Sequence, residues 1–164
     1  MYSGKVSAAD ANYEKIIRGS VVSLNEAGEI VLGLGAYSAS FCPMPMFSKK
    51  NIYDPDVMTG AKGATTGEIL ASSTVGGILP AYVATGAFEM ETSTFAAGEY
   101  TINMPLTASA DGKVTPATEG VYGSAAVVGI VSRKPFRSQA SMNVNGTGAN
   151  RLCFWTVFFP PKAQ

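Results

Sequence analysis

The sequence predicts an all-β protein: a small β-barrel or β-sandwich with an extended N-terminal arm and a long irregular loop. Short apolar or alternating runs are separated by turns that contain glycine and aspartate, at the spacing typical of β-rich domains. Only one segment, near the N-terminus, has apolar residues at helical spacing. We therefore expect a single β domain at 19–164, an arm or short helix at 1–18, and an extended excursion at about 42–86.

The first elements are expected before residue 35. Ser7–Asp10 resembles a capping box, and Tyr13, Ile16 and Ile17 follow at helical spacing, so this segment is either a short helix or a flexible arm. The turn residues that follow predict a β-hairpin. Its two strands and its turn are expected at 20–24, 29–32 and 25–28.

Residues 42–86 match neither a helical nor a strand pattern. Their prolines keep Cys42–Phe47 extended, and 59–77 is rich in glycine, alanine, serine and threonine. So long a loop is uncommon in a compact domain and is usually functional, so we expect it to pack on something outside its own core. Asp54 and Asp56 favour a turn over a calcium site, which would need more oxygen ligands.

The second half of the chain gives clearer strand signals. Asp111–Gly112 lies between two β segments and predicts a hairpin turn. In the last segment, the even-numbered residues Leu152–Phe158 and the odd-numbered residues Cys153–Phe159 would face opposite sides, and both sides are apolar. Such a strand needs cover on both sides, as a central strand or at a subunit interface. Strands are expected at 82–83, 88–92, 100–103, 106–108, 113–115, 127–131 and 151–159.

Composition and charge exclude several classes of function. The 164 residues carry 12 basic and 12 acidic side chains, so the net charge is zero and the basic excess of a nucleic-acid-binding protein is lacking. Only 15% of residues are charged, against about 25% in an average domain. There is no histidine, which removes the usual general base and the commonest metal ligand. We expect no enzymatic activity, no cofactor and no metal site.

Three smaller signals have plain structural interpretations. Glu89 and Glu91 share a strand face and could serve a glycosidase, but a solvated face is the favoured interpretation. The basic cluster at 133–137 is expected to be a loop that pairs with acidic patches on a protein partner rather than with nucleic acid. Cys42 and Cys153 match no metal spacing and are expected to be buried thiols. No secretory signal and no membrane span is expected.

Several phrases of the second half resemble the capsid decoration, or cement, proteins of tailed bacteriophages. The resemblance implies a β-rich domain, often trimeric, that binds the outside of an assembled icosahedral shell and stabilises it against internal DNA pressure. It implies no catalytic residues. The resemblance runs over 82–159, and the phrases that carry it are 82–95, 100–108, 112–117, 127–133 and 152–157.

The sequence and the resemblance together predict a virion structural protein on the capsid surface, assembled in the host bacterial cytoplasm. Its expected partners are the major capsid protein and further copies of itself, with a trimer favoured. Two alternatives stay open: a phage tail or head-fibre component, and a carbohydrate-binding β-sandwich adhesin, with a carboxylate-dependent hydrolase less favoured. Aromatic, methionine and arginine side chains dominate interface cores. On that ground the expected interface residues are Met44, Met46, Phe47, Arg137, Phe154, Trp155 and Phe158.

Overall fold

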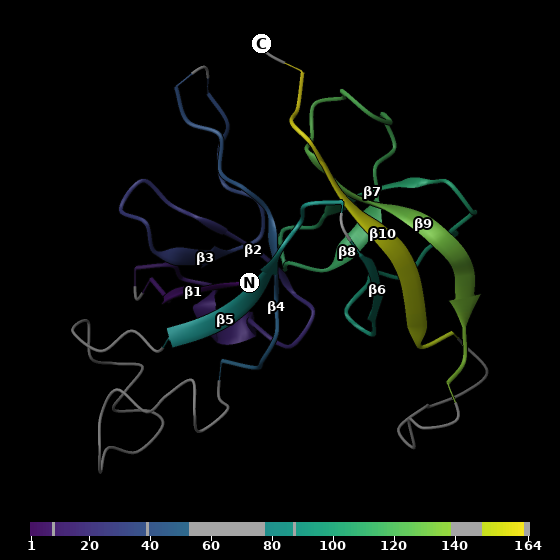
Figure 1. Cartoon of the computed structure of the whole chain (residues 1–164), viewed down its shortest axis with the longest axis horizontal. Coiled ribbons are helices and arrows are strands. Elements are labelled where there is room, and N and C mark those ends of the chain that lie inside the picture. Colours follow the sequence, from purple (N-terminus) through teal and green to yellow (C-terminus); the bar gives the residue numbers. More distant parts are fainter. Residues whose placement is uncertain (8, 39, 53–77, 87, 139–148, 163–164) are drawn as a thin grey trace. The chain divides into compact units, whose positions relative to one another are not determined.

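The computed structural model describes residues 1–7, 9–38, 40–52, 78–86, 88–138 and 149–162. Over these ranges the chain forms two antiparallel five-stranded sheets and one turn of 3₁₀ helix, which confirms the predicted all-β class (Figure 1). A closed barrel is not seen in the described parts of the chain. The chain divides into two compact units, Met1–Val83 with Ala108–Lys113, and Ala84–Thr107 with Val114–Gln164. A division within 19–164 was not predicted from the sequence.

Unit 1 is built on the first sheet, sheet A. Its strand order is β1-β5-β4-β2-β3. The predicted hairpin at 20–32 is present as β2 and β3, and Gly28 supplies the positive φ that its turn requires. The core residues Val22, Ile30 and Leu79 are fully buried. The strands are β1 (Tyr2–Lys5), β2 (Val21–Leu24), β3 (Ile30–Leu32), β4 (Met46–Ser48) and β5 (Ile78–Val83).

The N-terminal helix is not formed. Among the described residues of 7–17, the only helical turn is a single 3₁₀ turn, η1 (Tyr13–Lys15). The reason lies at Asp10, whose carboxylate accepts hydrogen bonds from the backbone N–H of Asn12 and of Leu32 instead of capping a helix. Ser7, the expected N-cap residue, donates its backbone N–H to the carbonyl of Ile30, so the start of the expected helix is bonded to β3 instead.

Unit 2 is built on the second sheet, sheet B, in the order β6-β10-β9-β7-β8. The long antiparallel pair β9 and β10 forms its centre (Figure 1). Phe154 is fully buried against Gly129, and Leu106, Val131 and Leu152 are buried as well. The strands are β6 (Glu89–Thr92), β7 (Pro105–Ala108), β8 (Val114–Pro116), β9 (Val127–Phe136) and β10 (Arg151–Phe159).

The predicted hairpin around Asp111–Gly112 is present as β7 and β8, with Gly112 at φ 72°. The strand predicted at 100–103 is wrong, because this segment forms a turn. Asn103 adopts φ 68°, a left-handed conformation that ends the extended run, and the backbone N–H of Met104 donates to the carbonyl of Thr101. Tyr100 is held by hydrogen bonds from its hydroxyl to the carbonyls of Ala96 and Val114.

Two regions singled out in the sequence are only partly within the described residues. Of the excursion at 42–86, residues 42–52 and 78–86 are described, and they supply β4 and β5. Asp54 and Asp56 lie outside the described residues. The basic cluster at 133–137 is not a loop, because β9 runs through it to Phe136.

Candidate protein–protein interface on sheet B

The two faces of β10 differ in exposure. Leu152, Phe154 and Thr156 are fully buried. On the opposite face Trp155 is 51% exposed at the middle of the strand. The predicted alternation therefore holds over Phe154–Thr156. Register shifts against β9 interrupt it on both sides, between Arg151 and Phe154, where Cys153 is buried, and between Thr156 and Phe159. The face of sheet B that carries Trp155 is called the Trp155 face below.

The strand register places Trp155 in a row that crosses four strands. Trp155 is paired with Glu89 of β6 on one side and with Ile130 of β9 on the other, and Ile130 is paired in turn with Pro105 of β7. Residues directly opposite each other in a sheet point to the same face. Ile130 and Pro105 are both partly exposed, so the row continues the apolar surface away from Trp155.

The charged groups beside Trp155 are already paired with one another. Arg133 donates two hydrogen bonds to Glu89, from Nε to Oε1 at 3.1 Å and from Nη2 to Oε2 at 2.7 Å, and the Ser132 hydroxyl donates to the same carboxylate. Arg151 Nε lies 3.0 Å from Glu91 Oε1. The two carboxylates and two guanidinium groups cancel, so this part of the Trp155 face is neutral.

The hydrogen bonds to Glu89 also bear on the glycosidase alternative. Those from Ser132 and Arg133 lower the pKa of the Glu89 carboxyl below its usual value. A general acid in glycoside hydrolysis needs the opposite, a raised pKa that keeps its proton at neutral pH. The Glu89 and Glu91 pair is therefore better suited to holding strands together than to acid catalysis.

The two cysteines are free and differ in exposure. Cys153 is paired in register with Glu91 and Arg133 and is only 2% exposed. Burial raises the pKa of its thiol, so it is unsuited to nucleophilic chemistry. Cys42 is exposed. The expectation of two buried thiols is thus met at Cys153 and wrong at Cys42, where the proline-rich segment leaves the side chain at the surface.

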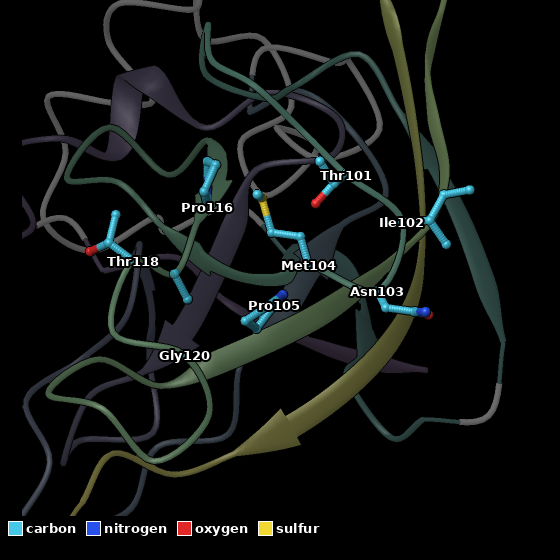
Figure 2. Close-up of a pocket in the computed structure, with 9 residues that line it drawn as sticks. Thr101, Ile102, Asn103, Met104, Pro105, Pro116, Thr118 and Gly120 are labelled. Carbon is cyan, nitrogen blue, oxygen red and sulfur yellow. The ribbon is translucent and has the colours of Figure 1, made fainter.

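An open hollow of about 400 Å³ lies where β7 begins and β8 ends (Figure 2). Pro105 belongs both to this hollow and to the row that contains Trp155. Ile102, which is 53% exposed, adds apolar surface at its edge. None of the residues lining the hollow is charged: they are Thr101, Ile102, Asn103, Met104, Pro105, Pro116, Ala117, Thr118 and Gly120.

The structure separates the seven expected interface residues into two groups. Met46, Phe47 and Phe154 are buried within the chain and have no surface to offer a partner. The surface group consists of Met44, which is 40% exposed, Arg137, which is exposed just beyond β9, the partly buried Phe158, and Trp155. Only Trp155 among them lies in the row across sheet B.

Sequence reasoning missed several exposed or partly exposed apolar residues of unit 2. Ile130 belongs to a continuous apolar run, and nothing in that run marks which residue faces outward. Ile102 and Tyr122 lie in turns, where their exposure depends on backbone conformation. Tyr122 has φ 64°, is 61% exposed and packs edge-on against Phe159, with ring centroids 5.7 Å apart.

Comparisons with known proteins identify no relative: no family model, no curated protein and no solved structure matches this chain. Within the described residues, no helix has the length and apolar character needed to cross a membrane. The described part of the chain also contains no group of three or more cysteine, aspartate and glutamate side chains placed to hold a metal ion.

Proposed function

We propose that this chain is a non-catalytic virion structural protein that binds and stabilises the outer surface of an icosahedral phage capsid. Its partners are the major capsid protein and further copies of itself, with a trimer favoured, and it acts on the capsid surface after assembly in the host cytoplasm. The observation that carries the proposal is the half-exposed Trp155 on a neutral sheet face.

The proposal is supported by the positions in the chain of the residues that resemble decoration proteins. The phrases similar to decoration proteins, at 82–95, 100–108, 112–117, 127–133 and 152–157, contain or overlap the five strands of sheet B. These are the strands that present Trp155, Ile130 and Pro105. The part of the chain that resembles decoration proteins is thus also the part with an apolar face available to a partner.

The chemistry of the Trp155 face is that of a protein contact. Tryptophan is enriched among the residues that dominate binding energy, above all where it is central and surrounded by groups that exclude water. The neighbouring charges are neutralised by Arg133–Glu89 and Arg151–Glu91, so covering the face leaves no isolated charge in need of a counter-ion. A shell offers many copies of one modest site, so multivalency strengthens attachment.

Co-sedimentation of the purified chain with capsid shells tests the proposal. Trp155→Ala should weaken binding by at least about tenfold, because it removes the largest apolar side chain of the face. Ile17→Ala is the matched control, since Ile17 is a 45% exposed apolar residue of unit 1, and it should bind like the unaltered chain.

A monodisperse monomer with no affinity for shells would overturn the proposal. Electron microscopy of the native particle separates the shell from the tail or head-fibre location.

One observation also favours the carbohydrate-binding alternative. Trp155 lies beside Glu89 and the Arg133 guanidinium, so an aromatic face and charged hydrogen-bonding groups are close together on an exposed sheet. Sugar recognition uses such combinations of an aromatic surface with a few polar groups. Binding of the intact chain to a glycan array, abolished by Trp155→Ala, together with no binding to shells, would establish this alternative.

A further inference from the structure

The N-terminal segment, residues 2–7 and 9–12, contacts both ends of the set formed by the other four strands of sheet A. On one side β1 pairs antiparallel with β5, from Tyr2 opposite Ala81 to Lys5 opposite Ile78. On the other side Val6 forms a parallel bridge to Ile30 of β3, and the backbone N–H of Ser7 donates to the Ile30 carbonyl at 2.8 Å. Because β5-β4-β2-β3 is the order of the remaining strands, one short segment bonds to both ends of that set.

Two side chains add polar contacts to the β3 side. Lys5 Nζ lies 3.0 Å from Glu29 Oε1, immediately before β3. Asp10 Oδ2 accepts a hydrogen bond of 2.7 Å from the backbone N–H of Leu32, which would otherwise be left at the strand's edge. The carboxylate thus takes the place of a strand carbonyl. Open edges of this kind pair readily with other chains, and covering them prevents that pairing.

Burial shows that the segment completes the core of unit 1 as well as its edges. Val6 is 3% exposed and Ser7 is 2% exposed, and Val6 packs with the fully buried Ile30 and Leu79. Gly4 is buried as well. The site therefore selects an apolar residue at position 6 and a carboxylate at position 10.

We propose that β5 and β3 form a strand-accepting site that the N-terminal segment fills within one chain and that the same segment of a second copy can fill instead. Backbone pairing supplies much of the affinity of such sites, and pockets for side chains supply specificity. The occupant follows from the contacts, because a second copy carries the same valine and carboxylate at the required spacing. The proposal stands independently of the capsid function, since it uses only contacts within unit 1.

The connection to the rest of the chain is suited to such an exchange. Beyond Ser7 the described backbone is held by local hydrogen bonds, with Asp10 N–H donating to the Ser7 carbonyl, Tyr13 N–H to that of Asp10 and Lys15 N–H to that of Asn12. Ala11 is exposed at this turn. When this hinge opens, only these local hydrogen bonds are lost. The contacts on β5 and β3 then become available to the N-terminal segment of another molecule.

A nicked form of the full chain tests the site without requiring a truncated chain to fold. A protease recognition sequence is inserted between Ala11 and Asn12, the chain is folded, and the insert is then cut. The cut segment should remain bound in gel filtration, and a fluorescent synthetic peptide of residues 1–11 should replace it saturably. Peptides with Val6→Asp or Asp10→Ala should bind at least about tenfold more weakly, and Ser3→Ala, at an exposed position, should bind equally. No binding of the peptide overturns the strand-accepting site.

Exchange between copies has its own test in the uncut chain. Deleting Ala11 and Asn12 shortens the hinge so that the segment no longer reaches both edges of its own sheet, and sedimentation velocity should show dimers in place of the parental species. Adding Val6→Asp to this deletion should abolish those dimers. Saturable peptide binding to the nicked chain, combined with no dimer from the shortened chain, overturns exchange between copies while leaving the site itself established.

Discussion

The aromatic ring of Phe154 lies directly over Gly129 in the centre of sheet B. A Cβ atom at position 129 would lie 2.5 Å from Phe154 Cδ2, and the Phe154 side chain is fully buried. We expect Gly129→Ala to lower the free energy of unfolding by about 1–3 kcal/mol, measured by urea denaturation. Gly98→Ala is the control, because the nearest atom there is 3.8 Å away. Equal effects of the two substitutions would contradict this packing.

The two free thiols give a second prediction at the scale of single residues. Cys42 is exposed, whereas Cys153 is 2% exposed and its burial raises its pKa. A thiol reagent should therefore modify one cysteine of the native chain rapidly at neutral pH and both after unfolding. Mass spectrometry of the modified peptides should place the fast reaction at Cys42. Rapid native labelling of Cys153 would show that the Trp155 face opens readily.

At the scale of elements, the turn between β7 and β8 depends on Asp111. Hydrogen bonds from the Ser109 hydroxyl and then from Lys113 lower the pKa of this carboxyl to about 2, from an ordinary value of 3.8. Because the folded-state pKa is the lower one, the ionised carboxylate stabilises the fold above about pH 3.8, and this contribution is lost as the pH falls through about 2.

Comparison with Asp111→Asn isolates this contribution. The unaltered chain should be the more stable of the two at pH 5 to 7, by less than about 1 kcal/mol because the ion pair is exposed to solvent. The difference between the urea midpoints of the two chains should shrink below about pH 3.8. A difference that stays constant down to pH 2 would show that Asp111 acts through the turn conformation alone.

The elements that the sequence predicted are those with local signals. Apolar alternation marks β10, and Asp111–Gly112 marks the hairpin, since both patterns act within a few residues. β1 has no such pattern, because Ser3 and Gly4 favour a strand only when β5 is already there to pair with it. The turn at Asn103 was missed because its left-handed backbone is fixed by distant contacts, including the hydrogen bond from its N–H to the Val131 carbonyl.

The same distinction applies to the candidate interface. Residue type alone placed Trp155, Phe154 and Phe47 together as interface candidates, yet only Trp155 is exposed. Which aromatic residue faces outward depends on strand pairing, which brings Arg133 and Glu89 together across 44 positions in the sequence. Pairing over such a distance leaves no local pattern from which it can be read.

At the scale of the whole molecule, the low charge bears on what force would drive binding. Twelve basic and twelve acidic residues cancel overall, and on the Trp155 face the cancellation is also local, through Arg133–Glu89 and Arg151–Glu91. Identical copies with no net charge do not repel one another at long range, which favours close packing on a shell. Binding through this face should then depend on apolar burial rather than on attraction between opposite charges.

Salt dependence of shell binding distinguishes these two driving forces. Raising NaCl from about 50 mM to about 500 mM shortens the Debye length from about 14 Å to about 4 Å and screens exposed charges, yet should change the affinity for shells by less than about threefold. Trp155→Ala should weaken binding at every salt concentration. The double substitution Lys134→Ala and Arg137→Ala removes two exposed cations at the end of β9, and it should leave the affinity within about twofold of the unaltered chain. A fall of more than tenfold with salt, abolished by the Lys134 and Arg137 substitutions, would move the contact from the Trp155 face to the basic end of β9.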